Sequence, residues 1–348
     1  MAWKLGQKLQ DGKYTIEQEL EQGCFAITYL AKDEDGHKLV IKTLNEDKLK
    51  RLPPVERDNL KCKFVDEARK LECCKHPHVV GVQKTFIEGQ QFCLAMEYVG
   101  GDTLASLTHR VLPEKQALRY IQQIGEALMA AHRQSLLHRD VKPANIRVRS
   151  GQSQAVLTNF DLIGEWDYPL TASWRDEPFA PIELASAKIC RGTCTDVYSL
   201  AATLYVLLTG QLPASAVVRQ KHKVNLIPPK EINPQISQRV NDAIMKGMRL
   251  APETRPQTMR EWLDLLGLKR GRAKSKLLGK QPRWVMLVEI LGVVGVLAAM
   301  LSTRIDVMAL WEKYVSPSLE KVTPSAKSQM KPSEVIPLPP QPPKFEGS

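Results

Sequence analysis

The first hundred residues alternate short runs of apolar and polar positions, the pattern of a half-buried β-sheet. Polar turns such as DEDG and EGQQ separate the runs. Residues 57–74 differ, because their apolar positions recur at helical spacing and therefore predict a helix. The apolar face of this helix comprises Leu60, Phe64, Val65, Ala68 and Leu71. The runs that predict strands are YTIEQEL, ITYLAKD, HKLVIKTL, VVGVQKTFIEG and QFCLAMEYV.

Residues 102–268 have mostly helical spacing. The clearest predicted helices are EKQALRYIQQIGEALMAAHRQ and TDVYSLAATLYVLLTG, followed by ISQRVNDAIMKGMRL and TMREWLDLLG. A small β-rich lobe followed by a large helical lobe is an α+β architecture. We therefore expect one bilobal domain over residues 1–268, with an N-lobe at about 1–99 and a C-lobe at about 100–268.

A long apolar run, WVMLVEILGVVGVLAAMLST, occupies 284–303 with Glu289 as its only charged residue. Twenty residues in a helix are about 30 Å long, which is enough to cross a membrane. The run predicts a single transmembrane helix, with a buried core helix as the alternative. The tail 304–348 contains eight prolines, a composition that predicts an extended and largely disordered segment.

The net charge of +11 is concentrated in residues 269–283, which hold seven Lys or Arg and no acid. Because this basic linker directly precedes the predicted span, we expect a cytoplasmic main domain and an extracytoplasmic tail. The basic residues then meet the lipid bilayer rather than nucleic acid. The N-terminal MAWKLGQKL lacks the apolar core of a cleaved signal peptide. Homodimerisation through the span stays open, although Gly292 and Gly295 lack the four-residue spacing of small-residue dimer motifs.

Several motifs with candidate chemistry follow one another along the bilobal domain. LEQGCFAITYLA, LVIK and FVDEARKL lie in the small lobe, and AMEYVGGDTL leads into the large one. LLHRDVKPANI, LTNFDLIG, PFAPIE and DVYSLAATLYVLLTG come next. Together they resemble the eukaryotic-like Ser/Thr protein kinases, of the membrane-anchored bacterial kind, over roughly residues 14–267. The resemblance implies ATP with Mg²⁺ or Mn²⁺ as cofactors and a protein Ser or Thr hydroxyl as substrate.

The motif LLHRDVKPANI implies the catalytic residues. By resemblance, Asp140 accepts the proton of the substrate hydroxyl and Asn145 holds a metal ion. Lys142 resembles the lysine that meets the γ-phosphate in Ser/Thr-specific kinases. Arg139 resembles an arginine that pairs with a phosphate on the activation segment. The candidate phosphorylation sites are Thr171 and Ser173, and the alternative acidic partners of this arginine are Asp167, Asp176 and Glu177.

The small lobe implies the residues that bind ATP. Lys42 of LVIK resembles the lysine that grips the α- and β-phosphates, and Glu67 on the following helix resembles the glutamate that pairs with it. Asp66 is the rival for that role, but it would point about 100° away around the helix. AMEYVGGDTL resembles the hinge between the lobes, which implies that Met96 lies at the back of the ATP pocket. The backbone of Glu97 to Val99 is expected at the adenine edge.

The loop LEQGCFAITYLA resembles a degraded form of the family's glycine-rich phosphate loop. Of the three glycines in the family pattern only Gly23 is present, while Glu21 and Ala26 occupy the outer two positions. Glycine lets backbone N–H groups approach phosphate closely, so these changes weaken the loop. Glu21 also puts an anion near an anionic ligand unless it points away.

The motif LTNFDLIG departs from the Asp-Phe-Gly of the family. With Phe160 aligned, Asn159 replaces the metal-binding aspartate, which removes a charge worth up to about 4 kcal/mol. Losing all of that from the transition state would slow transfer about a thousandfold. Asp161 either replaces the missing carboxylate at the metal or caps a turn. It occupies the glycine position, where a positive φ is expected.

Two functions are therefore compatible with the sequence. The first is an ATP-dependent protein Ser/Thr kinase with a weakened metal site, favoured by Asp140, Lys142 and Asn145. The second is a pseudokinase, a nucleotide- or partner-binding scaffold without phosphotransfer, favoured by Asn159 and Glu21. We expect the kinase.

Overall fold

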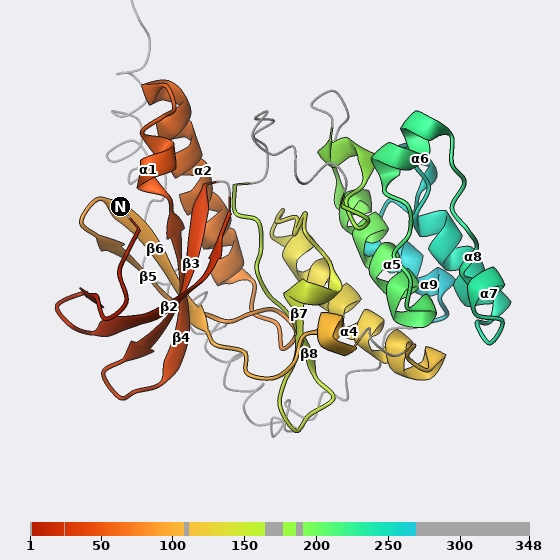
Figure 1. Cartoon of the computed structure of the whole chain (residues 1–348), viewed down its shortest axis with the longest axis horizontal. Helices are drawn as coiled ribbons and strands as arrows, with labels where there is room; N and C mark the ends of the chain where they lie inside the picture. Colours follow the sequence, from red (N-terminus) through yellow and green to blue (C-terminus); the bar gives the residue numbers. More distant parts are fainter. Residues whose placement is uncertain (1, 24, 108–110, 164–176, 186–190, 269–348) are drawn as a thin grey trace, which may run out of the picture. The chain divides into compact units, whose positions relative to one another are not determined.

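The computed structural model describes residues 2–23, 25–107, 111–163, 177–185 and 191–268 (Figure 1). The predicted linker 269–283, span 284–303 and tail 304–348 lie outside the described residues. Among the helices of the described part, none is long and apolar enough to cross a membrane.

The small lobe is built on a six-stranded antiparallel sheet, and all five predicted strands are present in it. A short additional strand, β1, pairs with the first of them. The spatial order is β1-β2-β3-β4-β6-β5. The strands are β1 Lys8–Leu9, β2 Tyr14–Gln22, β3 Ala26–Asp33, β4 Lys38–Leu44, β5 Val82–Glu88 and β6 Gln91–Glu97.

Two helices lie between β4 and β5, namely α1 (Glu46–Leu49) and α2 (Pro54–Cys73). Helix α2 begins three residues earlier than predicted, because a proline is favourable in the first turn, where its missing N–H is not needed. The predicted apolar face is buried, except that Val65 is only half-buried. Glu67 is buried on the same helix, so its charge requires a partner inside the protein.

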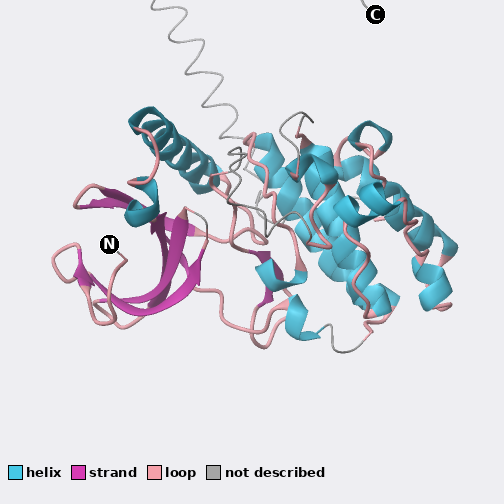
Figure 2. Ribbon diagram, turned by 45° about the horizontal axis from the view of Figure 1, so that its top comes forward, coloured by secondary structure: helices cyan, strands magenta, loops and turns pink. Residues whose placement is uncertain are grey.

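The large lobe is mainly helical, as predicted (Figure 2). Its central helix α5 is buried along almost its whole length, and α4, α8 and α9 pack against it. Gly210 ends α5 with a φ of 67°, a left-handed conformation that suits glycine. The helices are α3 Leu104–Leu107, α4 Glu114–Arg133, α5 Thr193–Thr209, α6 Ala216–His222, α7 Pro229–Ile232, α8 Gln238–Gly247 and α9 Met259–Leu265, with 3-10 turns at Pro143–Asn145, Ile182–Leu184 and Pro252–Thr254.

A two-stranded hairpin in the large lobe was not predicted. It consists of β7 (Ile146–Val148) and β8 (Ala155–Leu157), and it lies between the sheet and the helices of the large lobe (Figures 1 and 2). Three residues per strand are too few to give a recognisable alternation. The hairpin matters because LLHRDVKPANI leads into β7 and LTNFDLIG begins at the end of β8. It therefore brings the two motifs together.

One buried core runs through both lobes and fixes the hairpin. It includes Phe64 of α2, Leu94 of β6, Leu128 of α4 and Leu157 of β8. A second, smaller core covers the other face of the sheet, around Ile16, Tyr29 and Ile41. The residues between the sheet and the helical lobe are thus held by packing from both sides.

Candidate active site

The three predicted catalytic residues contact one another in the loop between α4 and β7. The Lys142 ammonium lies 3.1 Å from Asp140 Oδ1. The Asn145 amide donates to Asp140 Oδ2 at 2.7 Å and to the Asp140 carbonyl at 2.8 Å. Asp140 is 8% exposed, so its carboxylate is nearly buried between a cation and an amide.

The backbone of this loop is held by Asp196 at the start of α5. Its carboxylate accepts hydrogen bonds from the N–H groups of His138 at 3.0 Å and Arg139 at 2.9 Å. Arg139 has a φ of 66°, an uncommon conformation that these bonds help to maintain. Burial alone would raise the pKa of Asp196, but hydrogen bonds from His132 and His138 lower it. Asp196 is therefore a fixed anion beneath the loop.

The environment of Asp140 changes its acidity. Burial raises the pKa of this carboxyl from 3.8 to about 6, and the positive charge of Lys142 opposes the rise. A carboxylate whose pKa lies closer to neutrality is a better proton acceptor than an ordinary aspartate. Asp140 thus combines a suitable position with a suitable basicity.

Lys42, in the second half of β4, does not form the predicted ion pair with Glu67. Its ammonium instead donates to the Phe160 carbonyl at 2.7 Å and to Asn159 Oδ1 at 3.1 Å. Burial lowers the pKa of Lys42, and the negative charges of Asp161, Glu21 and Asp140 oppose that shift. Lys42 therefore joins the sheet directly to the segment after β8.

Glu67 is paired with other cations, which explains the failure of that prediction. Arg139 donates to its Oε2 at 3.1 Å, and Lys70 donates to its Oε1 at 2.9 Å. Arg139 is itself nearly buried, so its charge needs an acid as much as Glu67 needs a cation. The rival Asp66 is exposed and pairs with Lys70 at 2.7 Å, away from Lys42.

Asn159 is at the centre of a polar cluster that spans the two lobes. Its oxygen accepts from Lys42, as described above. Its amide nitrogen donates to Glu21 Oε2 at 2.8 Å and to Asn145 Oδ1 at 3.3 Å. The backbone of Asn159 has a φ of 59°, a left-handed conformation that Asn adopts more readily than most residues.

The positive φ was expected at Asp161, and that prediction was wrong. Among the described residues of this segment, Asn159 adopts it. Asp161 Oδ1 accepts from the N–H of Ile163 at 3.1 Å, which is the turn-capping contact considered as one of its two roles. The intervening Phe160 is 2% exposed and its ring packs 4.5 Å from that of His138.

The predicted phosphate loop is a tight connection between β2 and β3. Gly23 donates its N–H to the Ala26 carbonyl at 2.9 Å, and Lys48 donates to the Gly23 carbonyl at 2.7 Å. Ala26 begins β3 without a positive φ, so the missing glycine creates no strain there. Glu21 does not point away from the site, since its carboxylate reaches Asn159.

The predicted hinge follows β6. Met96 is buried, and the Glu97 N–H donates to the Gly81 carbonyl at 2.9 Å. The Glu97 carboxylate pairs with Arg149 at 2.8 Å. The predicted contact of Glu97 with adenine involves its backbone and not this side chain. Val99 is buried, and among the described residues no hydrogen bond engages its N–H.

The activation segment is largely outside the described residues, and so are Asp167, Thr171, Ser173 and Asp176. Glu177 is described, and its carboxylate lies 3.3 Å from the Lys142 ammonium. Among the residues that the structure describes, the acid that pairs with Arg139 is therefore Glu67 rather than Glu177. Sequence reasoning missed this pairing because both residues were assigned to other partners.

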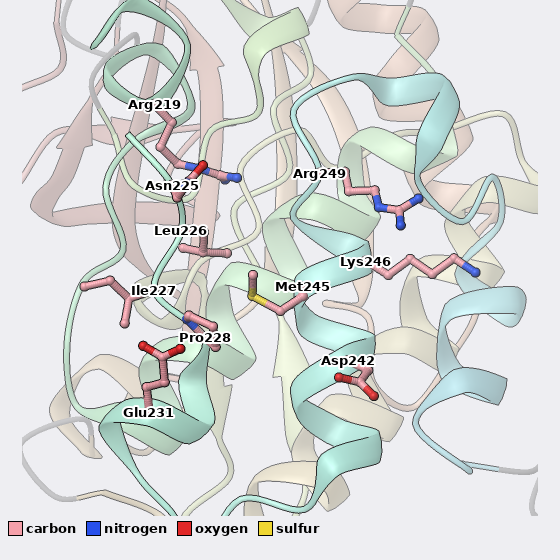
Figure 3. A pocket seen from close by; sticks show the side chains of 10 residues that line it. All are labelled: Arg219, Asn225, Leu226, Ile227, Pro228, Glu231, Asp242, Met245, Lys246 and Arg249. Atoms are coloured by element: carbon pink, nitrogen blue, oxygen red, sulfur yellow. The ribbon is translucent and has the colours of Figure 1, made fainter. Parts of the chain in front are cut away.

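A cavity of about 910 Å³ lies elsewhere, among α6, α7 and α8 of the large lobe (Figure 3). Its lining combines cations such as Arg219 and Lys246 with the acids Glu231 and Asp242 and with apolar residues such as Met245. Such a mixture has no strong preference for an anionic ligand, and none of the predicted site residues belongs to it. The cluster around Asp140 is therefore the candidate active site.

Comparison with known proteins assigns the family. The family model for the protein kinase domain matches residues 14–264, and the chain belongs to this family. Proteins of this family use ATP and a divalent metal. A probable serine/threonine-protein kinase of Clostridium perfringens is 30% identical over 265 residues, covering 73% of this chain and 38% of that protein. The serine/threonine-protein kinase pkn2 of Myxococcus xanthus is 29% identical over 275 residues, covering 74% and 32%. The matched part thus spans about a third of these relatives.

Solved structures have the same fold. The apo form of PpkA-294 matches with a TM-score of 0.61 at 24% identity, covering 76% of this chain and 99% of that one. The PknI kinase domain of M. tuberculosis matches with a TM-score of 0.59 at 24% identity, covering 76% and 98%. At these identities the likeness establishes the bilobal kinase fold predicted from the sequence.

Proposed function

We propose that this protein is an ATP-dependent protein serine/threonine kinase with a weakened metal site. The observation that carries the proposal is the joined set Asp140, Lys142 and Asn145 on a loop fixed by Asp196. The matched relatives are named serine/threonine kinases, which supports the same substrate class.

The reaction transfers the γ-phosphoryl group of ATP to a Ser or Thr hydroxyl. The hydroxyl oxygen forms a bond to the γ-phosphorus, the bond to the β–γ bridging oxygen breaks, and ADP leaves. Asp140 takes the hydroxyl proton and orients the nucleophile. Lys142, 3.1 Å from Asp140, meets the γ-phosphate charge, and Lys42 meets the α- and β-phosphates.

The residues present fit a hard divalent cation such as Mg²⁺ or Mn²⁺. Asn145 Oδ1 and the carboxylates of Asp140, Asp161 and Glu21 are oxygen donors, the type that these cations prefer. Asn145 and Asp161 would hold the cation, with Asn159 beside them as the residue that lacks the family's charge. When bound, the cation neutralises the charge on the phosphates.

The pH dependence of transfer tests the role of Asp140. The carboxylate must be ionised to accept a proton, and its pKa is raised to about 6, so we expect kcat/KM to fall below a midpoint near pH 6. Lys142→Met should raise that midpoint, because the Lys142 charge lowers the pKa of Asp140. Lys115→Met, an exposed lysine on α4, is the control and should leave the midpoint unchanged. A midpoint that stays fixed in Lys142→Met would argue against Asp140 as the titrating group.

Replacement of the buried lysine tests the nucleotide site. Lys42→Met should lower phosphotransfer about 100-fold or more, since it removes a cation aimed at the phosphates. The measurement is transfer of labelled γ-phosphate by the full 348-residue chain, followed by identification of phosphoserine and phosphothreonine. Lys38→Met changes an exposed lysine on the same strand and should retain wild-type transfer. Equal rates for the two variants would contradict the proposed ATP contact.

One observation favours the pseudokinase as a second candidate. Lys42 donates hydrogen bonds to Asn159 and Phe160, and Glu67 accepts one from Arg139. The Lys42–Glu67 ion pair that the resemblance to active kinases implies is therefore not formed. A scaffold that binds nucleotide without transferring phosphate would tolerate this arrangement. Nucleotide binding without Asp140-dependent transfer would favour this alternative.

We also propose that the domain is attached to a membrane through residues 284–303, with the basic linker on the cytoplasmic side. The support is the length and apolarity of that run and the adjacent positive charge. Homodimerisation through this segment is part of the same proposal. Sedimentation of the full chain with membranes, and its release on deletion of 284–348, would test it.

A further inference from the structure

The carboxylate of Glu21 and the amide of Asn159 are joined across 138 residues of chain. Glu21 lies near the end of β2, and Asn159 follows β8 in the large lobe. The 2.8 Å hydrogen bond between them brings the predicted phosphate loop into contact with the predicted metal site. Both residues also depart from the family pattern, one from glycine to an acid and the other from an acid to an amide.

The orientation of Asn159 decides which atoms can meet a cation. The one oxygen of the Asn159 side chain, Oδ1, accepts a hydrogen bond from Lys42 at 3.1 Å. Its nitrogen, a donor, is directed at Glu21 Oε2 and at Asn145 Oδ1. The side-chain oxygens that approach this point are therefore those of Glu21 and Asn145, whereas Asn159 offers N–H groups that a cation does not bind.

The charges explain why the two departures occur together. An aspartate at position 159 would put a second carboxylate in hydrogen-bonding distance of Glu21, and two like charges that close disfavour ionisation of both. An amide at 159 removes the repulsion and adds a hydrogen bond. The hydrogen-bonded pair of residues 21 and 159 thus keeps one negative charge, which Glu21 of the small lobe carries instead of residue 159.

We propose that Glu21 supplies a further carboxylate ligand for the divalent cation of the nucleotide complex, beside Asn145 and Asp161, and that Asn159 positions the Glu21 side chain. This inference rests on the proposed function in placing a metal–nucleotide complex at the site. It differs in naming a ligand from the phosphate loop. Because Glu21 is at the exposed edge of the loop, its side chain can exchange the amide of Asn159 for a cation without repacking of the core.

Direct measurement of Mn²⁺ binding tests the proposal. The full chain is titrated with Mn²⁺ in the presence of a non-hydrolysable ATP analogue, and free Mn²⁺ is followed by electron paramagnetic resonance. Glu21→Gln should weaken Mn²⁺ binding about 10-fold or more, because it removes the charge and keeps the shape. Glu19→Gln, an exposed glutamate on the same strand, is the matched control and should bind like the wild type.

A double-mutant cycle then tests the exchange of charge between the two positions. Adding Asn159→Asp to Glu21→Gln should restore most of the lost Mn²⁺ affinity, since one carboxylate returns to the site. Wild-type affinity in Glu21→Gln, or no recovery in the double variant, would overturn the proposal.

Phosphotransfer measured on the same proteins separates this inference from the proposed function. Glu21-dependent Mn²⁺ binding with no phosphotransfer would support the inference and contradict the kinase. Phosphotransfer that depends on Asp140, with Mn²⁺ binding unaffected by Glu21→Gln, would support the kinase and overturn the inference.

Discussion

Asp140→Asn is expected to lower phosphotransfer about 100- to 10,000-fold and at the same time to raise the melting temperature at neutral pH. The loss of transfer follows from the loss of the proton acceptor, whose contribution in general base catalysis is of this size. The substitution leaves the shape of the loop intact, because Asn can still accept the hydrogen bond from Asn145. If Asp140 only stabilised the fold, the same substitution would lower the melting temperature.

The gain in stability follows from the raised pKa of Asp140. Its folded pKa of about 6 exceeds the ordinary value of 3.8, so the folded state holds the proton more tightly and the ionised carboxylate is destabilising. This cost is fully present above about pH 6 and disappears as the pH falls below about 4. We expect Asp140→Asn to add about 1–2 kcal/mol at about pH 7.5, after allowance for the lost contact with Lys142.

Thermal unfolding of both proteins between about pH 4 and pH 7.5 checks this second part. The difference in melting temperature should be largest at the upper end of this range and should shrink toward the lower end. A variant that melts lower than the wild type at the upper end would contradict the electrostatic account of Asp140, even if transfer were lost.

Glu183→Gln should lower the free energy of unfolding more than any other substitution considered for this chain. Arg255 donates to both carboxylate oxygens of Glu183, at 2.6 and 2.9 Å, and both side chains are fully buried. Removing the charge of Glu183 leaves a buried guanidinium without its anion, which costs about 3 kcal/mol or more.

The measurement is urea unfolding of the full chain, with Glu17→Gln as a matched control. Glu17 pairs with Lys32 on the surface of the sheet, where an ion pair contributes about 1 kcal/mol or less. The urea midpoint should therefore fall much further for Glu183→Gln than for Glu17→Gln. Similar midpoints for the two variants would mean that burial of the Glu183 pair contributes little.

The sequence predicted the fold well where the periodicity extended over several turns or alternations. Helices α4 and α5 and the five predicted strands are present close to their expected bounds. The β7–β8 hairpin was missed because its strands are three residues long and are held by packing between the lobes rather than by their own pattern.

The sequence predicted which residues form the active site, but it did not predict all of the contacts between their side chains. The contacts among Asp140, Lys142 and Asn145 are local, so a short motif contains them. The pairing of Glu67 depends on which of two buried cations, Lys42 or Arg139, is nearer in three dimensions, and a sequence does not specify that. The three-dimensional structure pairs Glu67 with Arg139.

The sequence indicated the contact between Glu21 and Asn159 through two departures from the family pattern, one at each residue, but the two departures were interpreted separately. Glu21 was considered as a defect of the phosphate loop, and Asn159 as a defect of the metal site. The two changes move one negative charge from one motif to the other, and their complementarity could have indicated that the side chains meet. The left-handed backbone of Asn159 had no such signal, because Asp161 occupies the position where the family has glycine.

The central claim is that this kinase domain transfers phosphate although Asn159 replaces the metal-binding aspartate. Single-turnover transfer from γ-labelled ATP by the full chain, with Mg²⁺ and then Mn²⁺, tests it most directly when wild type and Asp140→Asn are compared. We expect phosphoserine or phosphothreonine in the wild type with at least one of the two metals, and none in the variant. Nucleotide binding without transfer by the wild type in either metal would contradict it.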